Sequence, residues 1–152
     1  MEIIEPIPQN SSISMHEIEK FETHLGTKLP KEYSDFLLFY NGGRPRPSGF
    51  RFLEENAETE SRIQFFYGIN SHRSYSILRK MDIFMDRVPT GTIPIACDGV
   101  GNQILLSIRT ADYGTILFWD HEKEPTEDGD GSTCTSLVAR SFAEFTKLLT
   151  EL

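Results

Sequence analysis

The chain has 152 residues, which is the length of one ordinary domain and enough to bury a hydrophobic core without metals or disulfides. Its 15 basic and 23 acidic residues give a formal net charge of −8, which opposes binding to nucleic acid or to an anionic membrane and favours a cationic partner. No apolar run approaches the ~18 residues that span a bilayer, and the acidic N-terminus is unlike a signal peptide, so we expect a cytoplasmic protein. Cys97 and Cys134 form no CxxC pair and are expected to be free thiols.

The N-terminal part of the chain predicts a pair of helices. Ser14 and Glu17 have the spacing of a capping box, and apolar residues follow at helical intervals until Gly26, which favours the left-handed conformation that ends a helix. Pro30 suits the first turn of a second helix. The wide apolar stripe of this second helix stops at residues 41–43, Asn-Gly-Gly, which predict its end.

The next segment changes character. Residues 44–62 contain prolines, then Phe50 and Phe52, then a run of glutamates, and they predict a loop, a short strand and an exposed loop. Residues 62–67 are rich in aromatic and β-branched side chains and predict a further strand. Residues 74–85 place apolar side chains at helical intervals and predict a third helix.

The clearest β pattern lies in the second half of the chain. Three short apolar runs at residues 93–97, 103–109 and 115–119 are separated by two stretches of turn residues with the lengths of hairpin loops. This pattern predicts an antiparallel meander.

After the meander, residues 120–133 form a polar segment that predicts a loop. Ser141 and Glu144 repeat the capping-box spacing, and the apolar positions that follow, as far as Leu152, predict a C-terminal amphipathic helix. Helices flank hairpin-connected strands instead of alternating with them, which indicates an α+β fold. We therefore expect a single domain, residues 1–152, with an antiparallel β-sheet meander flanked by an N-terminal helix pair, a middle helix and a C-terminal helix.

Catalytic and metal-binding motifs are incomplete in this sequence. Residues 128–132 open like a calcium loop, but Thr133 and Ala139 stand where such a loop needs Gly and a bidentate Glu. Residues 99–101 carry two glycines of a phosphate-binding fingerprint without the third, and residues 121–125 lack the second His of a zinc-protease motif. We expect no enzyme activity, no cofactor and no metal.

Two sets of short motifs, one in each half of the chain, carry a resemblance to a known family. The first set is Phe21-Glu22, Leu25-Gly26, Leu29-Pro30, Tyr33, Phe36-Leu37 and Asn41-Gly42-Gly43. The second set is Ile93-Pro94-Ile95-Ala96, Asp98, Gly101-Asn102, Gly114, Phe118-Trp119-Asp120, Ser141-Phe142 and Phe145. In this order and spacing the chain resembles the SUKH superfamily, which includes the fungal cell-wall-assembly regulator domain and many bacterial immunity proteins.

The resemblance implies an α+β domain without catalysis that acts as the antitoxin of a secreted polymorphic toxin, commonly a nuclease with an LXG-type delivery region. An acidic protein suits direct inhibition of a basic nuclease, because nucleases present cationic clefts to phosphate backbones. Two alternatives stay open. The same domain occurs in regulatory scaffolds or adaptors with unrelated partners, and a cryptic enzyme would need a pocket with converging titratable groups.

Two acidic segments are the candidate contacts for a protein toxin. The carboxylates are Glu54, Glu55, Glu58 and Glu60 in the first segment, and Asp120, Glu122, Glu124, Glu127, Asp128 and Asp130 in the second. Clustered carboxylates steer a cationic partner towards them. The alternative is that both segments are solvated loops kept charged for solubility. We expect at least one of them to bind the toxin and favour residues 120–130.

Overall fold

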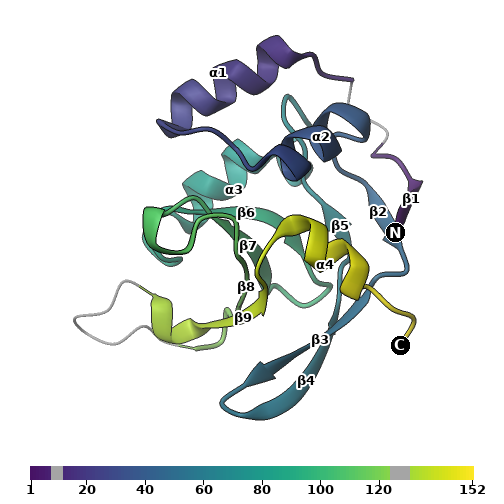
Figure 1. The fold of residues 1–152 in the computed structure, drawn as a ribbon, viewed down its shortest axis with the longest axis vertical. Coiled ribbons are helices and arrows are strands. Elements are labelled where there is room, and N and C mark those ends of the chain that lie inside the picture. Colours follow the sequence, from purple (N-terminus) through teal and green to yellow (C-terminus); the bar gives the residue numbers. More distant parts are fainter. Residues whose placement is uncertain (8–11, 124–130) are drawn as a thin grey trace.

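The computed structural model describes residues 1–7, 12–123 and 131–152 (Figure 1). Its α-helices are α1 (Met15–Leu25), α2 (Lys31–Phe39), α3 (Ile77–Phe84) and α4 (Phe142–Leu148). Its main antiparallel sheet has the strand order β5 (Phe65–Phe66), β6 (Thr92–Cys97), β7 (Gln103–Ser107), β8 (Ile116–Trp119) and β9 (Thr135–Ala139). Two smaller antiparallel sheets pair β1 (Glu2–Glu5) with β2 (Arg44–Arg46), and β3 (Gly49–Glu54) with β4 (Ala57–Arg62). The predicted α+β class is confirmed.

No helix in the described part of the chain is long and apolar enough to cross a membrane.

The predicted N-terminal helix pair is confirmed, together with the signals that bound it. The backbone N–H of Ser14 donates to Glu17 Oε2 at 2.8 Å, which completes the capping box of α1. Gly26 ends α1 with a φ of 79°. Pro30 stands immediately before α2, as its fixed φ favours.

The Asn-Gly-Gly segment does more than end α2. Asn41 adopts a φ of 48°, and its buried amide makes two hydrogen bonds to the backbone of Ile69: Nδ2 donates to the carbonyl, and the Ile69 N–H donates to Oδ1, both at 2.8 Å. Gly42 has a φ of 94°, and a Cβ there would lie 2.7 Å from the carbonyl oxygen of Phe66. The segment therefore fixes the end of α2 against the chain that leaves β5.

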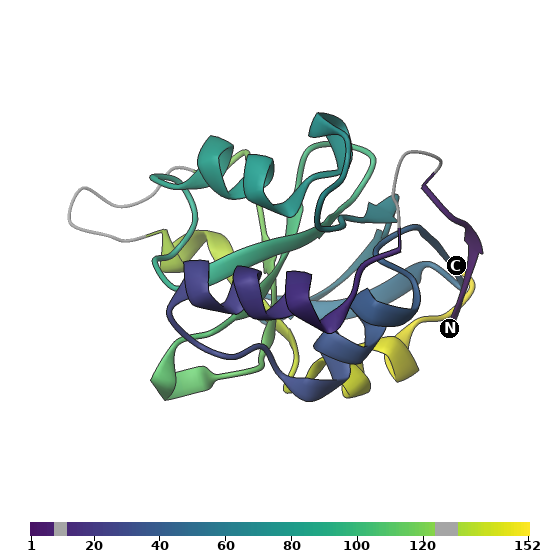
Figure 2. The same ribbon diagram turned by 90° about the horizontal axis from the view of Figure 1, so that it is seen from above.

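The predicted meander is confirmed, and its strands are covered on both faces. Every residue of β6, β7 and β8 is buried. Ile104 and Phe118 belong to the main core with α2 and α4, whereas Leu105 and Leu117 belong to a smaller cluster that Phe84 of α3 covers. Figure 2 shows α3 on one side of the sheet and α2 and α4 on the other. This explains why these strands have continuous apolar runs instead of alternation.

The prediction for residues 44–62 is wrong in part. The glutamate-rich stretch expected to be an exposed loop is the second half of the hairpin β3–β4, with Arg51 opposite Glu60 and Phe52 opposite Thr59. Glu is a poor strand former, but the pairing of opposite charges across the strands offsets that preference.

Other boundaries also differ from the sequence predictions. The strand predicted over residues 62–67 is shorter than expected. Arg62 belongs to β4, and only Phe65–Phe66 form β5. The third helix begins at Ile77, where Ser76 Oγ accepts the N–H of Arg79 at 3.2 Å, after a short 3₁₀ turn, Arg73–Tyr75. Strands β1 and β9 were not predicted, and β2 occupies residues that were predicted to form a loop.

The C-terminal helix is confirmed but is shorter than predicted. α4 ends at Leu148, and Leu149 is extended. The chain then pairs with the start of β3, where the N–H of Gly49 donates to the Thr150 carbonyl at 2.9 Å and the N–H of Thr150 donates to the Gly49 carbonyl at 2.8 Å. Because this pairing needs an extended backbone, the helix ends before Leu149.

Aromatic rings join the helices, the sheet and the hairpin into one core. Phe36 of α2 lies 4.9 Å from Phe66 of β5, measured between ring centroids. Phe145 of α4 lies 5.4 Å from Phe50 of β3 in an edge-to-face arrangement, and Phe52 of β3 lies 4.5 Å from Phe118 of β8. Such ring pairs add to the free energy gained from burying their area.

We predict that Phe145→Ala and Phe36→Ala each lower the free energy of unfolding by about 3–5 kcal/mol, because both rings are buried and little can refill the space. Phe39→Ala is the matched control. Phe39 is 78% exposed, so the same substitution there should change stability by less than about 0.5 kcal/mol. Urea unfolding of the three variants measures this, and equal losses at all three positions would contradict the assignment of the core.

Candidate partner-binding surface

The hairpin β3–β4 presents two chemically different faces. Phe50 and Phe52 point into the core, whereas Arg51 and Leu53 lie on the exposed face, opposite Glu60 and Glu58 respectively. Figure 1 shows the hairpin extending from the lower end of the molecule. The sequence therefore folds into an arm with an apolar inner face and a charged outer face.

The tip of this arm is a two-residue turn. Glu55 and Asn56 have φ values of 50° and 67°, between Glu54 and Ala57, which pair with each other. Positive φ at both central residues matches the right-handed twist of a hairpin. The turn places Glu54 and Glu55 at the outer end of the arm.

The two predicted acidic segments meet at this tip. Lys123 Nζ lies 2.6 Å from Glu54 Oε1 and 3.5 Å from Glu55 Oε1. The hydrogen bond to Glu54 raises the pKa of Lys123, and the Coulombic attraction of both carboxylates acts in the same direction. The arm tip therefore binds an ammonium group of its own chain.

The residues before Lys123 are held by hydrogen bonds that their backbone N–H groups donate. The N–H of Asp120 donates to the Cys134 carbonyl at 2.9 Å, and Asp120 Oδ1 accepts the N–H of Glu122 at 2.9 Å. The N–H of His121 donates to Asn102 Oδ1 at 3.1 Å. Asp120 is thus part of the turn that positions Lys123, while Glu122 is exposed.

We call this hairpin, with its predicted contact residues Glu54, Glu55, Glu58 and Glu60 and with the neighbouring Asp120 and Glu122, the acidic arm. Its charge is partly neutralised, because Arg51 Nε lies 2.9 Å from Glu60 Oε1 and 3.9 Å from Glu58 Oε1. The roles of Arg51 and Lys123 as counter-ions were not predicted from the sequence. The sequence did carry a signal for Arg51. It alternates with Phe50 and Phe52, and in a strand this alternation places it on the face opposite the two rings.

The predicted residues Glu124, Glu127, Asp128 and Asp130 lie outside the described residues.

Several residues that carry the family resemblance fix loops to one another. Asp98 is buried, and its Oδ1 accepts the N–H groups of Val100 and Asn102, both at 2.9 Å. The Ser61 hydroxyl of the arm donates to Asp98 Oδ2 at 3.4 Å. The loop 98–102 therefore contacts both the arm and, through Asn102, the turn at 120–123.

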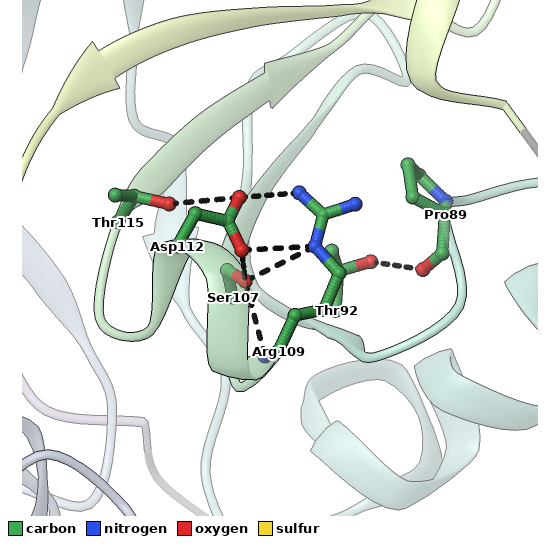
Figure 3. A network of polar contacts seen from close by, with 6 residues as sticks. All are labelled: Pro89, Thr92, Ser107, Arg109, Asp112 and Thr115. Carbon is green, nitrogen blue, oxygen red and sulfur yellow. Dashed lines mark hydrogen bonds and ion pairs between the residues drawn. The ribbon is translucent and has the colours of Figure 1, made fainter.

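A second polar cluster closes the connection between β7 and β8 (Figure 3). Ser107 is fully buried and its hydroxyl donates to Asp112 Oδ1, while Arg109 Nε donates to the same oxygen at 3.0 Å. The Thr115 hydroxyl donates to Asp112 Oδ2 at 3.4 Å. Because the hydroxyls and the guanidinium all converge on one carboxylate, the arrangement suits closing a turn rather than activating a nucleophile.

The structure shows no cluster of metal-binding side chains in residues 1–7, 12–123 and 131–152: no three His, Cys, Asp or Glu residues there are placed to share an ion. Cys97 and Cys134 are buried free thiols, and burial is the main cause that raises the pKa of Cys97. A raised pKa disfavours the thiolate, which is the reactive form.

The fold is that of a small α+β domain with a meander, an aromatic core and an acidic arm. The sequence pattern of the SMI1/KNR4 family (SUKH-1) matches residues 12–147. The chain belongs to this family. It is also 33% identical to a Bacillus subtilis (strain 168) protein described as the SPbeta prophage-derived uncharacterized protein YokK, in an alignment that covers 88% of this chain and 73% of that protein.

We predict that Asp112→Asn destabilises the fold in a pH-dependent way. Hydrogen bonding from Arg109 lowers the pKa of Asp112 below its ordinary value, despite some desolvation. A carboxylate with a lowered folded-state pKa contributes stability above its unfolded pKa of about 3.9, and the contribution is lost as the pH falls through the folded value. The variant should therefore lose about 1–2 kcal/mol at neutral pH.

Urea unfolding at neutral pH and below pH ~3 tests this, with the exposed Asp82→Asn as control. The difference between Asp112→Asn and the unsubstituted protein should shrink at the lower pH. A loss that is the same at both pH values would show that the charge of Asp112 plays no part.

Proposed function

We propose that the protein is an immunity protein that neutralises a secreted polymorphic toxin by binding it directly in the cytoplasm, and that the toxin is a basic nuclease of the LXG type. Membership of the SUKH-1 family supports this proposal, because many members of the superfamily are immunity proteins. The net charge of −8 supports a cationic partner.

The observation that carries the proposal is the ammonium held at the tip of the acidic arm. Glu54 and Glu55 contact Lys123 Nζ at 2.6 and 3.5 Å. We expect a lysine or arginine of a toxin to displace Lys123 from these carboxylates and to meet the exposed Glu58 and Glu122 as well. The arm therefore offers acceptors in a geometry that already suits a cation.

A nuclease is the partner that this chemistry favours. Its active site binds a phosphate backbone through Lys and Arg side chains, and carboxylates on an inhibitor compete for the same groups. Long-range attraction between opposite charges also speeds the encounter. Glu124, Glu127, Asp128 and Asp130 remain in the proposal on the strength of their charge and their place in the sequence next to Lys123.

The first experiment is growth rescue. The product of the neighbouring reading frame should arrest growth when expressed alone in the cytoplasm, and co-expression of this protein should restore growth. The purified proteins should form a complex. A complex without rescue would favour the regulatory scaffold, and a neighbouring product that is harmless or does not bind would contradict the proposal.

The second experiment tests the arm. The double variant Glu58→Gln and Glu122→Gln should slow association with the toxin about tenfold at low salt and weaken its salt dependence, because both charges are exposed and steer the encounter. The matched control is Glu19→Gln with Asp82→Asn, which removes the same charge from exposed positions on α1 and α3. α1 lies at the other end of the molecule from the hairpin β3–β4 (Figure 1). Equal association rates for the two double variants would contradict a role for the arm.

A further inference from the structure

A shallow apolar groove lies between α2 and α4. The two helices run next to each other in Figures 1 and 2, and the rings of Phe36 and Phe142, with centroids 5.2 Å apart, join them beneath the surface. The depression above these rings has a volume of about 440 Å³, and Met1, Phe39 and Thr146 also line it. Its floor is therefore aromatic and anchored in the main core.

Phe39 is the most unusual residue of this surface. It is 78% exposed at the end of α2, with its ring in edge contact with Tyr40. Phe39 also lines a second depression of about 340 Å³, together with Ile3 and Leu38. An exposed aromatic ring that borders two depressions has the form of a binding hot spot.

The rim of the groove is acidic. Glu32 and Asp35 of α2 line it, and both are exposed; Asp35 pairs with Lys31 at 2.7 Å. No Lys or Arg occurs among the described residues that line this groove. The rim charge and the net charge of −8 disfavour a second copy of the chain in this position, and they favour an apolar group that arrives with positive charges beside it.

We infer that the α2–α4 groove binds an amphipathic cationic segment of a protein partner, with an apolar side chain of that segment packed against Phe39 and its Lys or Arg side chains beside Glu32 and Asp35. The inference depends on the proposed function only for the identity of the partner, which is then the toxin.

The groove is connected to the acidic arm through the backbone. α4 leads directly to Thr150, which exchanges two hydrogen bonds with Gly49 at the start of β3. The base of the hairpin therefore lies next to the end of α4. In a complex that covers both surfaces, the exposed charges of the arm govern the rate of association, and the apolar contact at Phe39 governs the rate of dissociation.

The groove is tested without the toxin. The probe is a short helical peptide with leucines and one tryptophan on one face and lysines on the other, titrated into ¹⁵N-labelled protein. Backbone amide shifts should concentrate in α2 and α4. An otherwise identical peptide with glutamate in place of every lysine should cause no such shifts, because the acidic rim repels it.

Substitutions then locate the contact. Phe39→Ala should weaken the lysine peptide about tenfold, whereas Met85→Ala, at a residue that is 67% exposed on the other side of the sheet, should leave it unchanged. Glu32→Lys should weaken the lysine peptide and strengthen the glutamate peptide. Unfolding measurements on each variant check that the fold is retained.

Three results would overturn the inference: shifts confined to the acidic arm, equal effects of Phe39→Ala and Met85→Ala, or shifts in α2 and α4 that depend on protein concentration without peptide. The last would assign the groove to a second copy. Failure of growth rescue with intact peptide binding would refute the proposed function alone, and rescue without peptide binding would refute the groove alone.

Discussion

The packing of Phe50 and Phe52 against Phe118 and Phe145 is the contact on which the acidic arm depends. An isolated two-stranded hairpin is marginally stable in water. Here its inner face is held by rings of β8 and α4, at centroid distances of 4.5 Å for Phe52 and Phe118 and 5.4 Å for Phe50 and Phe145. This anchoring allows the outer face to be charged, and it brings the tip within reach of Lys123.

The helices and the meander could be predicted because their signals are local. A capping box, a glycine at a positive φ, and apolar runs separated by turn residues each act within a few positions of the chain. The hairpin β3–β4 could not be fully predicted, because Glu alone does not favour a strand. Glu58 and Glu60 lie in β4 because they pair with Leu53 and Arg51 of β3. The same applies to β9, whose pairing with β8 spans residues far apart in sequence.

The candidate site was predictable in composition but not in geometry. The sequence shows where carboxylates cluster, yet it does not show that Lys123 neutralises part of that charge or that Arg51 neutralises another part. The residues of the family resemblance have a different role. Asn41, Asp98 and Asn102 form hydrogen bonds that hold loops of this fold together. Recognition, by contrast, is usually carried by exposed side chains of loops.

The structure therefore combines a scaffold held by buried rings and hydrogen bonds with an exposed surface that we propose binds a toxin. The central proposal is that the toxin covers the acidic arm and the face of α2 and α4. Hydrogen–deuterium exchange of the protein, alone and with the purified toxic product of the neighbouring reading frame, tests this claim most directly. We expect slower exchange in residues 49–62, 120–123 and the two helices. Protection confined to α1 and α3, with these segments unchanged, would contradict it.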